Sequence, residues 1–172
     1  IKQGNYAEIA EWILQGSIDC GFTITPPLNG LKNTILFEDR LFVIYPPGHP
    51  LASCEAIYPE DLTGYPFILV NEGRDPLIRH FFESRNIKLK IQYHVVDDYA
   101  TIAMVESNLG ISVCPELFFY RLPYNVLHRP IETSFRRKIS ISYKKNFTLS
   151  PVVKQFISYV QKWTQENLEP GL

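Results

Sequence analysis

The stretch DDYATIAMVESNLGISVCPE, residues 97–116, contains the pattern that decides the fold class. Asp97 or Asp98 is a suitable N-cap for a helix, because its carboxylate accepts hydrogen bonds from the free N–H groups of the first turn. Gly110 ends this helix. The apolar run 111–114 that follows is typical of a short buried strand, which a proline closes. A helix followed directly by a buried strand is the basic unit of an α/β protein.

The same alternation extends outward from this stretch in both directions. Between Asn5 and Gly16, apolar residues recur at the i, i+3, i+4, i+7 and i+8 spacing of one helical face, and Asn5 with Glu8 has the pattern of a capping box. Similar signals predict helices at 6–15, 59–62, 76–85, 98–108 and from 151 onward, and strands at 18–24, 34–45, 67–70, 90–96, 111–114, 126–129 and 138–143. Such alternation indicates mixed, mostly parallel sheets covered by helices.

The strands fall into two groups, which predicts two lobes within one chain. The last helix has a strong apolar face that needs a sheet to cover, and the first group of strands is short of helices. We therefore expect the chain to cross to a second lobe near Val70–Asn71 and to return near 136–145. The predicted lobe I comprises residues 1–70 and 137–172, and lobe II comprises residues 71–136.

Composition and charge limit the classes of function. Of the 172 residues, 45% are hydrophobic and 20% are charged, as in ordinary globular proteins. The net charge is −1, with 17 basic and 18 acidic residues, whereas a nucleic-acid-binding domain usually has a basic excess. The short cluster 136–138 is interpreted as a solvated strand entrance and not as a phosphate site. We expect no direct contact between this chain and DNA.

No motif for catalysis, metal binding or a cofactor is found. Asp97 and Asp98 are adjacent and point in different directions, so they are interpreted as helix caps and not as a catalytic pair. The cysteines form no CxxC pair, which predicts no metal site and weakly favours a reducing compartment. The histidines have no metal-ligand spacing. The start of the chain lacks the apolar segment of a signal peptide, so none is expected, and no apolar run reaches the length of a membrane span. The cysteines are Cys20, Cys54 and Cys114, and the histidines are His49, His80, His94 and His128.

The carboxyl ends of the predicted strands are the best place for a ligand, because open α/β sheets bind ligands there. Asn71, Glu72 and Gly73 lie between a strand and a predicted helix start, where backbone N–H groups attract anions. A plain turn before a capped helix would have the same sequence. The range 23–25 ends another strand, and the hydroxyls of its two threonines could bind a polar ligand; a simple β-branched strand end is the alternative. The expected ligand is a small organic acid or a similarly polar metabolite.

Several stretches of the sequence resemble the effector-binding domain of LysR-type bacterial transcription regulators. The most telling is NLGISVCPE at 108–116, together with the PPGHPLA loop at 46–52. The other matching stretches are 4–12, 15–22, 60–62, 67–69 and 98–106. The resemblance covers nearly the whole chain.

The resemblance implies a two-lobed fold of the type II periplasmic-binding-protein kind, with an effector in the interlobe cleft. It implies a cytoplasmic homodimer or tetramer that binds DNA through an N-terminal helix-turn-helix, which we expect to lie outside this chain. The family's first strand and helix are also expected to lie outside it. No enzymatic activity and no cofactor are expected. The full set of candidate ligand-binding residues is Thr23, Ile24, Thr25, Pro46, Asn71, Glu72, Gly73, Asp98, Tyr99, Gly110 and Ile111.

A periplasmic solute-binding protein of a transporter is the alternative function for such a fold. That alternative predicts a secretion signal upstream of this chain, whereas a regulator predicts an upstream helix-turn-helix. The sequence upstream of residue 1 therefore distinguishes the two.

Overall fold

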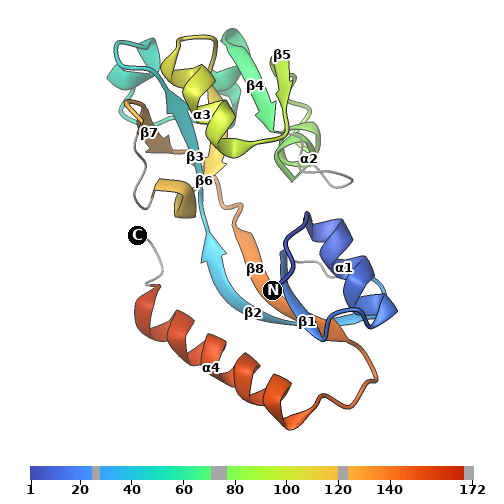
Figure 1. Ribbon diagram of the computed structural model, residues 1–172. Helices are drawn as coiled ribbons and strands as arrows, with labels where there is room; N and C mark the ends of the chain where they lie inside the picture. Colours follow the sequence, from blue (N-terminus) through green and yellow to red (C-terminus); the bar gives the residue numbers. More distant parts are fainter. Residues whose placement is uncertain (25–27, 71–76, 120–123, 169–172) are drawn as a thin grey trace. The chain divides into compact units, whose positions relative to one another are not determined.

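The computed structural model describes residues 1–24, 28–70, 77–119 and 124–168, which form two compact units (Figure 1). Unit 1 comprises Ile1–Asp39 and Arg136–Leu172, and unit 2 comprises Arg40–Phe135. The return crossing is close to the predicted one, but the first crossing lies between Asp39 and Arg40 and not near Val70. Residues 40–70 therefore belong to unit 2, because their strands pair there.

Unit 1 is a sheet of three strands with a helix on each face. Its strand order is β1 (Cys20–Ile24), β8 (Arg137–Lys144) and β2 (Leu31–Asp39). Successive strand residues point to opposite faces. Ile141 packs against Val153 and Ile157 of α4 (Pro151–Asn167), while Gly21, which pairs with Ser142, faces the Ile9 side chain of α1 (Tyr6–Gln15). The two helices thus cover opposite faces of the sheet (Figure 1).

The predicted signals at the ends of α1 are confirmed. The Asn5 backbone N–H donates to Glu8 Oε2 at 2.8 Å, and the Glu8 N–H donates to Asn5 Oδ1 at 3.0 Å, which together form the capping box. Gly16 adopts a left-handed conformation with φ of 74°, which ends the helix without a side-chain clash. The local sequence alone determines both ends of this helix.

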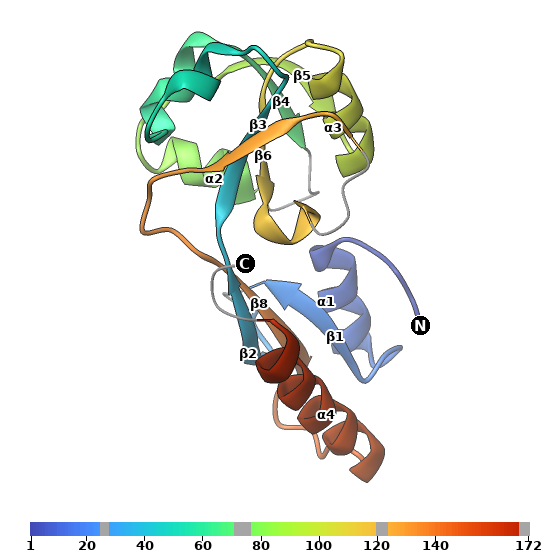
Figure 2. The same ribbon diagram turned by 90° about the vertical axis from the view of Figure 1, so that its left-hand side faces the viewer.

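Unit 2 has a three-stranded sheet of β6 (Ser112–Pro115), β3 (Leu41–Tyr45) and β7 (Leu127–Pro130), with β3 in the centre (Figure 2). A second ladder joins β4 and β5, and a bridge between Phe67 and Ile111 places β4 beside β6. The strands are β4 (Pro66–Val70) and β5 (Lys90–Val95), the α-helices are α2 (Leu77–Glu83) and α3 (Asp98–Glu106), and the 3-10 helices are η1 (Pro50–Ser53), η2 (Pro59–Gly64) and η3 (Glu116–Phe119).

The α/β class is confirmed, but the expectation of mostly parallel sheets is wrong for the described strands. Both ladders of unit 1 and both ladders on β3 are antiparallel, and β4 with β5 is the parallel ladder. The reason lies in the crossings. The chain leaves unit 1 along β2 and returns along its neighbour β8, so these two strands must run in opposite directions.

The segment at 136–138 leads into β8, as the sequence predicted, but it is only partly solvated, because Arg137 is buried. Arg137 is 6% exposed and forms an ion pair with Asp39, which is fully buried. The two residues face each other as the last pair of the β2–β8 ladder. Burial of the guanidinium is tolerated because the carboxylate lies directly across the ladder.

Candidate functional site

In unit 1, the candidate residues Thr23 and Ile24 end β1 beside the start of β8. Thr23 pairs with Ser140 and Ile24 with Ile139, so both lie at the edge where the chain leaves and re-enters the unit. Thr23 is 4% exposed, and its hydroxyl lies 2.6 Å from the Ser142 hydroxyl. The Thr23 hydroxyl that the sequence predicted at this strand end is therefore held by the Ser142 hydroxyl.

The structure adds three polar residues that the sequence analysis did not select. Ser140 and Ser142 are fully buried on the same face as Thr23, and the Asn33 amide donates to the Ser140 hydroxyl at 3.3 Å. Hydroxyl groups can both donate and accept hydrogen bonds. The Ser142 hydroxyl thus fixes the position of the Thr23 hydroxyl. The alternation of serine and isoleucine at 139–142 was the sequence signal that the two serines share a face.

In unit 2, Asp98 and Tyr99 lie at the carboxyl edge of a parallel ladder. Val70 pairs with Val95, so the segment after β4 and the segment after β5 leave the sheet at the same edge. Asp97 is the N-cap of α3, and its Oδ1 accepts the Ala100 N–H at 2.8 Å. Asp98 is half-buried and Tyr99 is 57% exposed. Tyr99 is therefore available to a ligand, whereas Asp97 already serves the helix.

Four of the candidates lie outside the described residues. They are Thr25 after β1 and the Asn71, Glu72 and Gly73 segment after β4, together with the predicted helix cap at 75–76. Their neighbours are described: Val70 ends β4, and Leu77 begins α2.

The remaining candidates, Pro46, Gly110 and Ile111, lie at the opposite edge of the unit 2 sheet. The β3–β6 ladder pairs Ile44 with Ser112, so Pro46 after β3 lies beside the start of β6. Ile111 is fully buried in the core, and a Cβ on Gly110 would come within 2.6 Å of the Pro66 carbonyl oxygen. The structure does not bring these three residues together with Asp98 and Tyr99. Their environment is that of core and turn residues.

A second ion pair lies at the same edge as Asp98. Arg40, the first residue of unit 2, donates through Nε at 3.0 Å and through a terminal nitrogen at 2.7 Å to the two carboxylate oxygens of Glu116. The Glu116 N–H in turn donates to the Arg40 carbonyl at 3.0 Å. Arg40 is thus held in place by a bidentate pair.

Three described residues have shifted pKa values. One of them is His128, whose pKa is lowered by burial, while the nearby Glu116 carboxylate opposes the shift. Burial lowers the pKa of His49, whose Nδ1 accepts the Leu51 N–H at 3.3 Å, and burial raises the pKa of the Cys20 thiol, with Asp19 adding to the effect. No cluster of three or more metal-ligand side chains occurs among the described residues. Nor does the described chain contain a helix that is both long and apolar enough to cross a membrane. Burial is the largest cause of each of these pKa shifts.

Residues 1–165 match the family model described as the LysR substrate binding domain. The chain belongs to this family. The resemblance predicted from the sequence is therefore confirmed.

The LysR substrate-binding domain described here is similar to known regulators and to a ligand complex. It is 30% identical over 163 residues to the uncharacterized HTH-type transcriptional regulator YybE of Bacillus subtilis (strain 168), covering 93% of this chain and 56% of that protein. It is 26% identical over 167 residues to the transcriptional dual regulator GltC of the same organism, covering 93% of this chain and 55% of that protein. The chain thus spans little more than half the length of these relatives.

Among solved structures, the domain is similar to the effector binding domain of QuiR in complex with shikimate. The TM-score is 0.84 at 27% sequence identity, and the match covers 97% of this chain and 81% of that chain. This likeness confirms the type II periplasmic-binding-protein-like fold expected from the sequence.

Proposed function

We propose that this LysR substrate-binding domain senses a small polar metabolite for a transcription regulator and does not chemically change it. The observation that carries the proposal is the likeness to the QuiR effector binding domain with shikimate, which extends over 97% of this chain. The relatives named above are transcriptional regulators, which supports sensing over catalysis.

The proposed ligand-binding residues form one set on each unit, each at the edge where the chain crosses. The unit 1 set is the end of β1. The unit 2 set is the carboxyl edge of β4 and β5. We assign Thr23, Ile24 and Thr25 to the first set and Asn71, Glu72, Gly73, Asp98 and Tyr99 to the second.

A small organic acid is the proposed ligand class. The backbone N–H groups expected at 71–76 would attract a carboxylate, and the hydroxyl of Thr23 would accept or donate a hydrogen bond to a neutral polar group. Tyr99, being exposed, offers a ring and a hydroxyl to the remainder of the ligand.

A thermal-shift screen of this domain against organic acids, with shikimate in the panel, tests the proposal. A ligand that binds only the folded state at 100-fold excess over its Kd adds about 2.7 kcal/mol to the free energy of unfolding. We expect Thr23→Val to remove the shift caused by the best acid. No shift with any acid in the panel would contradict the proposed ligand class.

Ser142→Ala is the matched control for this variant. Both substitutions break the hydrogen bond between the Thr23 and Ser142 hydroxyls, so both lower the basal stability by a similar amount, about 1 kcal/mol. Only Thr23→Val removes the hydroxyl that we assign to the ligand. Equal loss of the ligand shift in both variants would show that the hydroxyl acts through the fold alone.

For the whole protein, we propose a cytoplasmic homodimer or tetramer that binds DNA through a helix-turn-helix outside this chain. The similarity to YybE, an HTH-type transcriptional regulator of which the match covers 56%, supports this proposal. Sedimentation of the full-length protein measures its oligomeric state. Operator affinity measured with and without the acid found in the screen tests regulation, and unchanged affinity would contradict it.

A further inference from the structure

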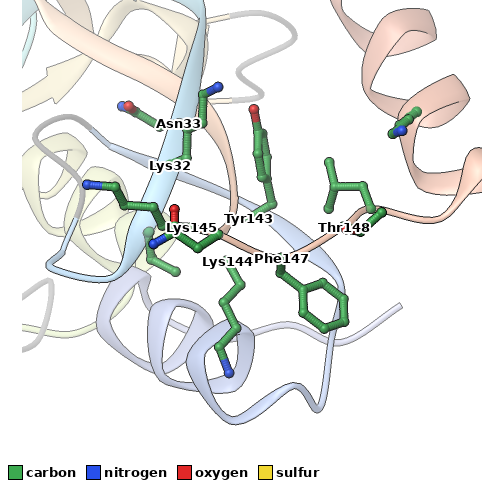
Figure 3. A pocket seen from close by; sticks show the side chains of 11 residues that line it. Lys32, Asn33, Tyr143, Lys144, Lys145, Phe147 and Thr148 are labelled. Atoms are coloured by element: carbon green, nitrogen blue, oxygen red, sulfur yellow. The ribbon is translucent and has the colours of Figure 1, made fainter.

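A basic pocket lies at the end of the unit 1 sheet that is farthest from the crossings. It has a volume of about 750 Å³ and lies among the start of β2, the end of β8, the segment after β8 and the first turn of α4 (Figure 3). The β2–β8 ladder pairs Leu31 with Lys144 at this end and Asp39 with Arg137 at the other. The pocket is therefore separate from the proposed effector residues at the end of β1. Its lining residues are Leu31, Lys32, Asn33, Tyr143, Lys144, Lys145, Asn146, Phe147, Thr148, Leu149 and Lys154.

Two of the four lysines, Lys32 and Lys154, lie on one side of the sheet. Lys32 and Tyr143 are a register pair on the face that α4 covers. Lys154 comes from the first turn of α4, above this face. Lys145 follows the end of β8, and its side chain points away from Tyr143 and Thr148 (Figure 3). The fourth lysine, Lys144, points to the other side, toward α1, and donates to the Leu14 carbonyl at 2.8 Å (Figure 3).

The positive charge of this pocket is not neutralised within the described chain. No aspartate or glutamate lines the pocket, and among the described residues no ion pair involves Lys32, Lys145 or Lys154. By contrast, Lys138 on the same strand pairs with Glu38 at 3.1 Å. Like charges around one concave site raise the local concentration of anions.

The uncharged lining indicates what kind of anion fits. The Tyr143 ring stands between the strand that carries Lys32 and the segment that carries Thr148 (Figure 3). The two hydroxyls can donate to anionic oxygens. Phe147 and Leu149 supply apolar surface for an organic part. The volume lies in the range of small-molecule sites.

We propose that this pocket binds a small anion that bears phosphate and carries more than one negative charge. Lysine ammonium groups are compact point charges that bind phosphate oxygens, and several of them around one pocket favour a ligand with more than one negative charge. A second ligand site on unit 1, chemically different from the effector site, follows from this geometry.

Calorimetric titration of the 172-residue chain with pyrophosphate at low salt tests the proposal. We expect saturable binding that Lys32→Gln and Lys154→Gln each weaken about five- to tenfold, because each removes one charge-assisted contact. Lys162→Gln is the matched control: it makes the same charge change on α4, but Lys162 is outside the pocket and pairs with Glu166 at 3.8 Å. Circular dichroism of each variant shows that the fold is retained.

Four outcomes decide the matter. Loss confined to the two pocket variants, with Thr23→Val binding pyrophosphate normally, supports a separate phosphate site. No saturable binding of pyrophosphate overturns the proposal. An equal loss with Lys162→Gln overturns it too, because the effect is then one of net charge. Tight binding of duplex DNA that competes with pyrophosphate, weakened alike by all three lysine variants, identifies a nucleic-acid surface and also overturns the small-anion site.

Discussion

At the scale of single residues, the ion pair of Asp39 and Arg137 is the strongest constraint on unit 1. Both side chains are buried, and they close the β2–β8 ladder where the chain enters and leaves the unit. Sequence analysis could not find this pair, because the two residues are far apart in the chain and the polar cluster at 136–138 is equally typical of a solvated surface. Only the register of the ladder shows that they meet.

Asp39→Asn should lower the free energy of unfolding by about 3–5 kcal/mol, because it leaves a buried guanidinium without its counter-charge. Glu38→Gln is the control one residue earlier. The Glu38–Lys138 pair is about half exposed, so its loss should cost less than about 1 kcal/mol. Urea unfolding monitored by circular dichroism measures both, and similar losses in the two variants would contradict the role given to burial.

His49 should make the domain less stable in mild acid. Its pKa in the folded state is lowered by burial, so the unfolded chain binds the proton more readily. Its contribution to stability is complete above the unfolded pKa of about 6.5 and is lost as the pH falls below that value toward the folded pKa. His49→Asn keeps an N-cap acceptor for Leu51 without a titrating ring. Urea unfolding at pH 7.5 and 5.5 should show a smaller pH effect in the variant; an unchanged pH effect would refute this role.

At the scale of elements, local signals predicted the helices well but not all of their faces. The capping box of α1 and the Ser150 cap of α4 lie within a few residues of the sequence they control, so they could be recognised directly. The predicted apolar face of α4 is confirmed for Val153 and Ile157, which are buried, but Phe156 is 45% exposed. Helical spacing alone does not distinguish which of two adjacent apolar positions faces the sheet.

The two neighbouring positions on α4 offer a direct test of this face. Ile157→Ala should cost about 2–4 kcal/mol, because it opens a cavity against Ile141. Phe156→Ala removes a larger side chain but should cost less than about 1 kcal/mol, since much of the ring is in contact with solvent. Chemical unfolding of the two variants measures the difference, and a greater loss for Phe156→Ala would reverse the assignment.

At the scale of the whole molecule, the number of units was predictable but the position of the first crossing was not. The apolar run of β4 resembles any buried strand, and nothing local tells which sheet it joins. The bridge of Phe67 with Ile111 and the ladder with β5, both long-range, place it in unit 2. For the candidate site, the expectation that ligands bind at the carboxyl ends of strands predicted Thr23. The buried serines beside it could not be predicted, because their position depends on the long-range pairing of β1 with β8.

Unit 2 should retain its structure longer than unit 1 under native conditions. Its core contains the largest buried cluster, and all of β3 is buried, whereas unit 1 relies on two small clusters on either face of its sheet. Hydrogen exchange followed by mass spectrometry should therefore show slower exchange for amides of β3 than for those of α4. Equal protection across both elements would mean that the chain opens as one cooperative unit.

The two ion pairs at the first crossing have a kinematic consequence. Asp39 is held by Arg137 within unit 1, and the very next residue, Arg40, is held by Glu116 within unit 2. Only the ψ torsion of Asp39 and the φ torsion of Arg40 separate these two anchors. On the return path, Phe135 packs against Phe81 in unit 2, with ring centroids 5.0 Å apart, and Arg137 is already anchored in unit 1. Any rearrangement of the units therefore has to pass through a few torsions at two adjacent points. Two adjacent connections of this kind allow rotation about a single axis and resist rotation about others.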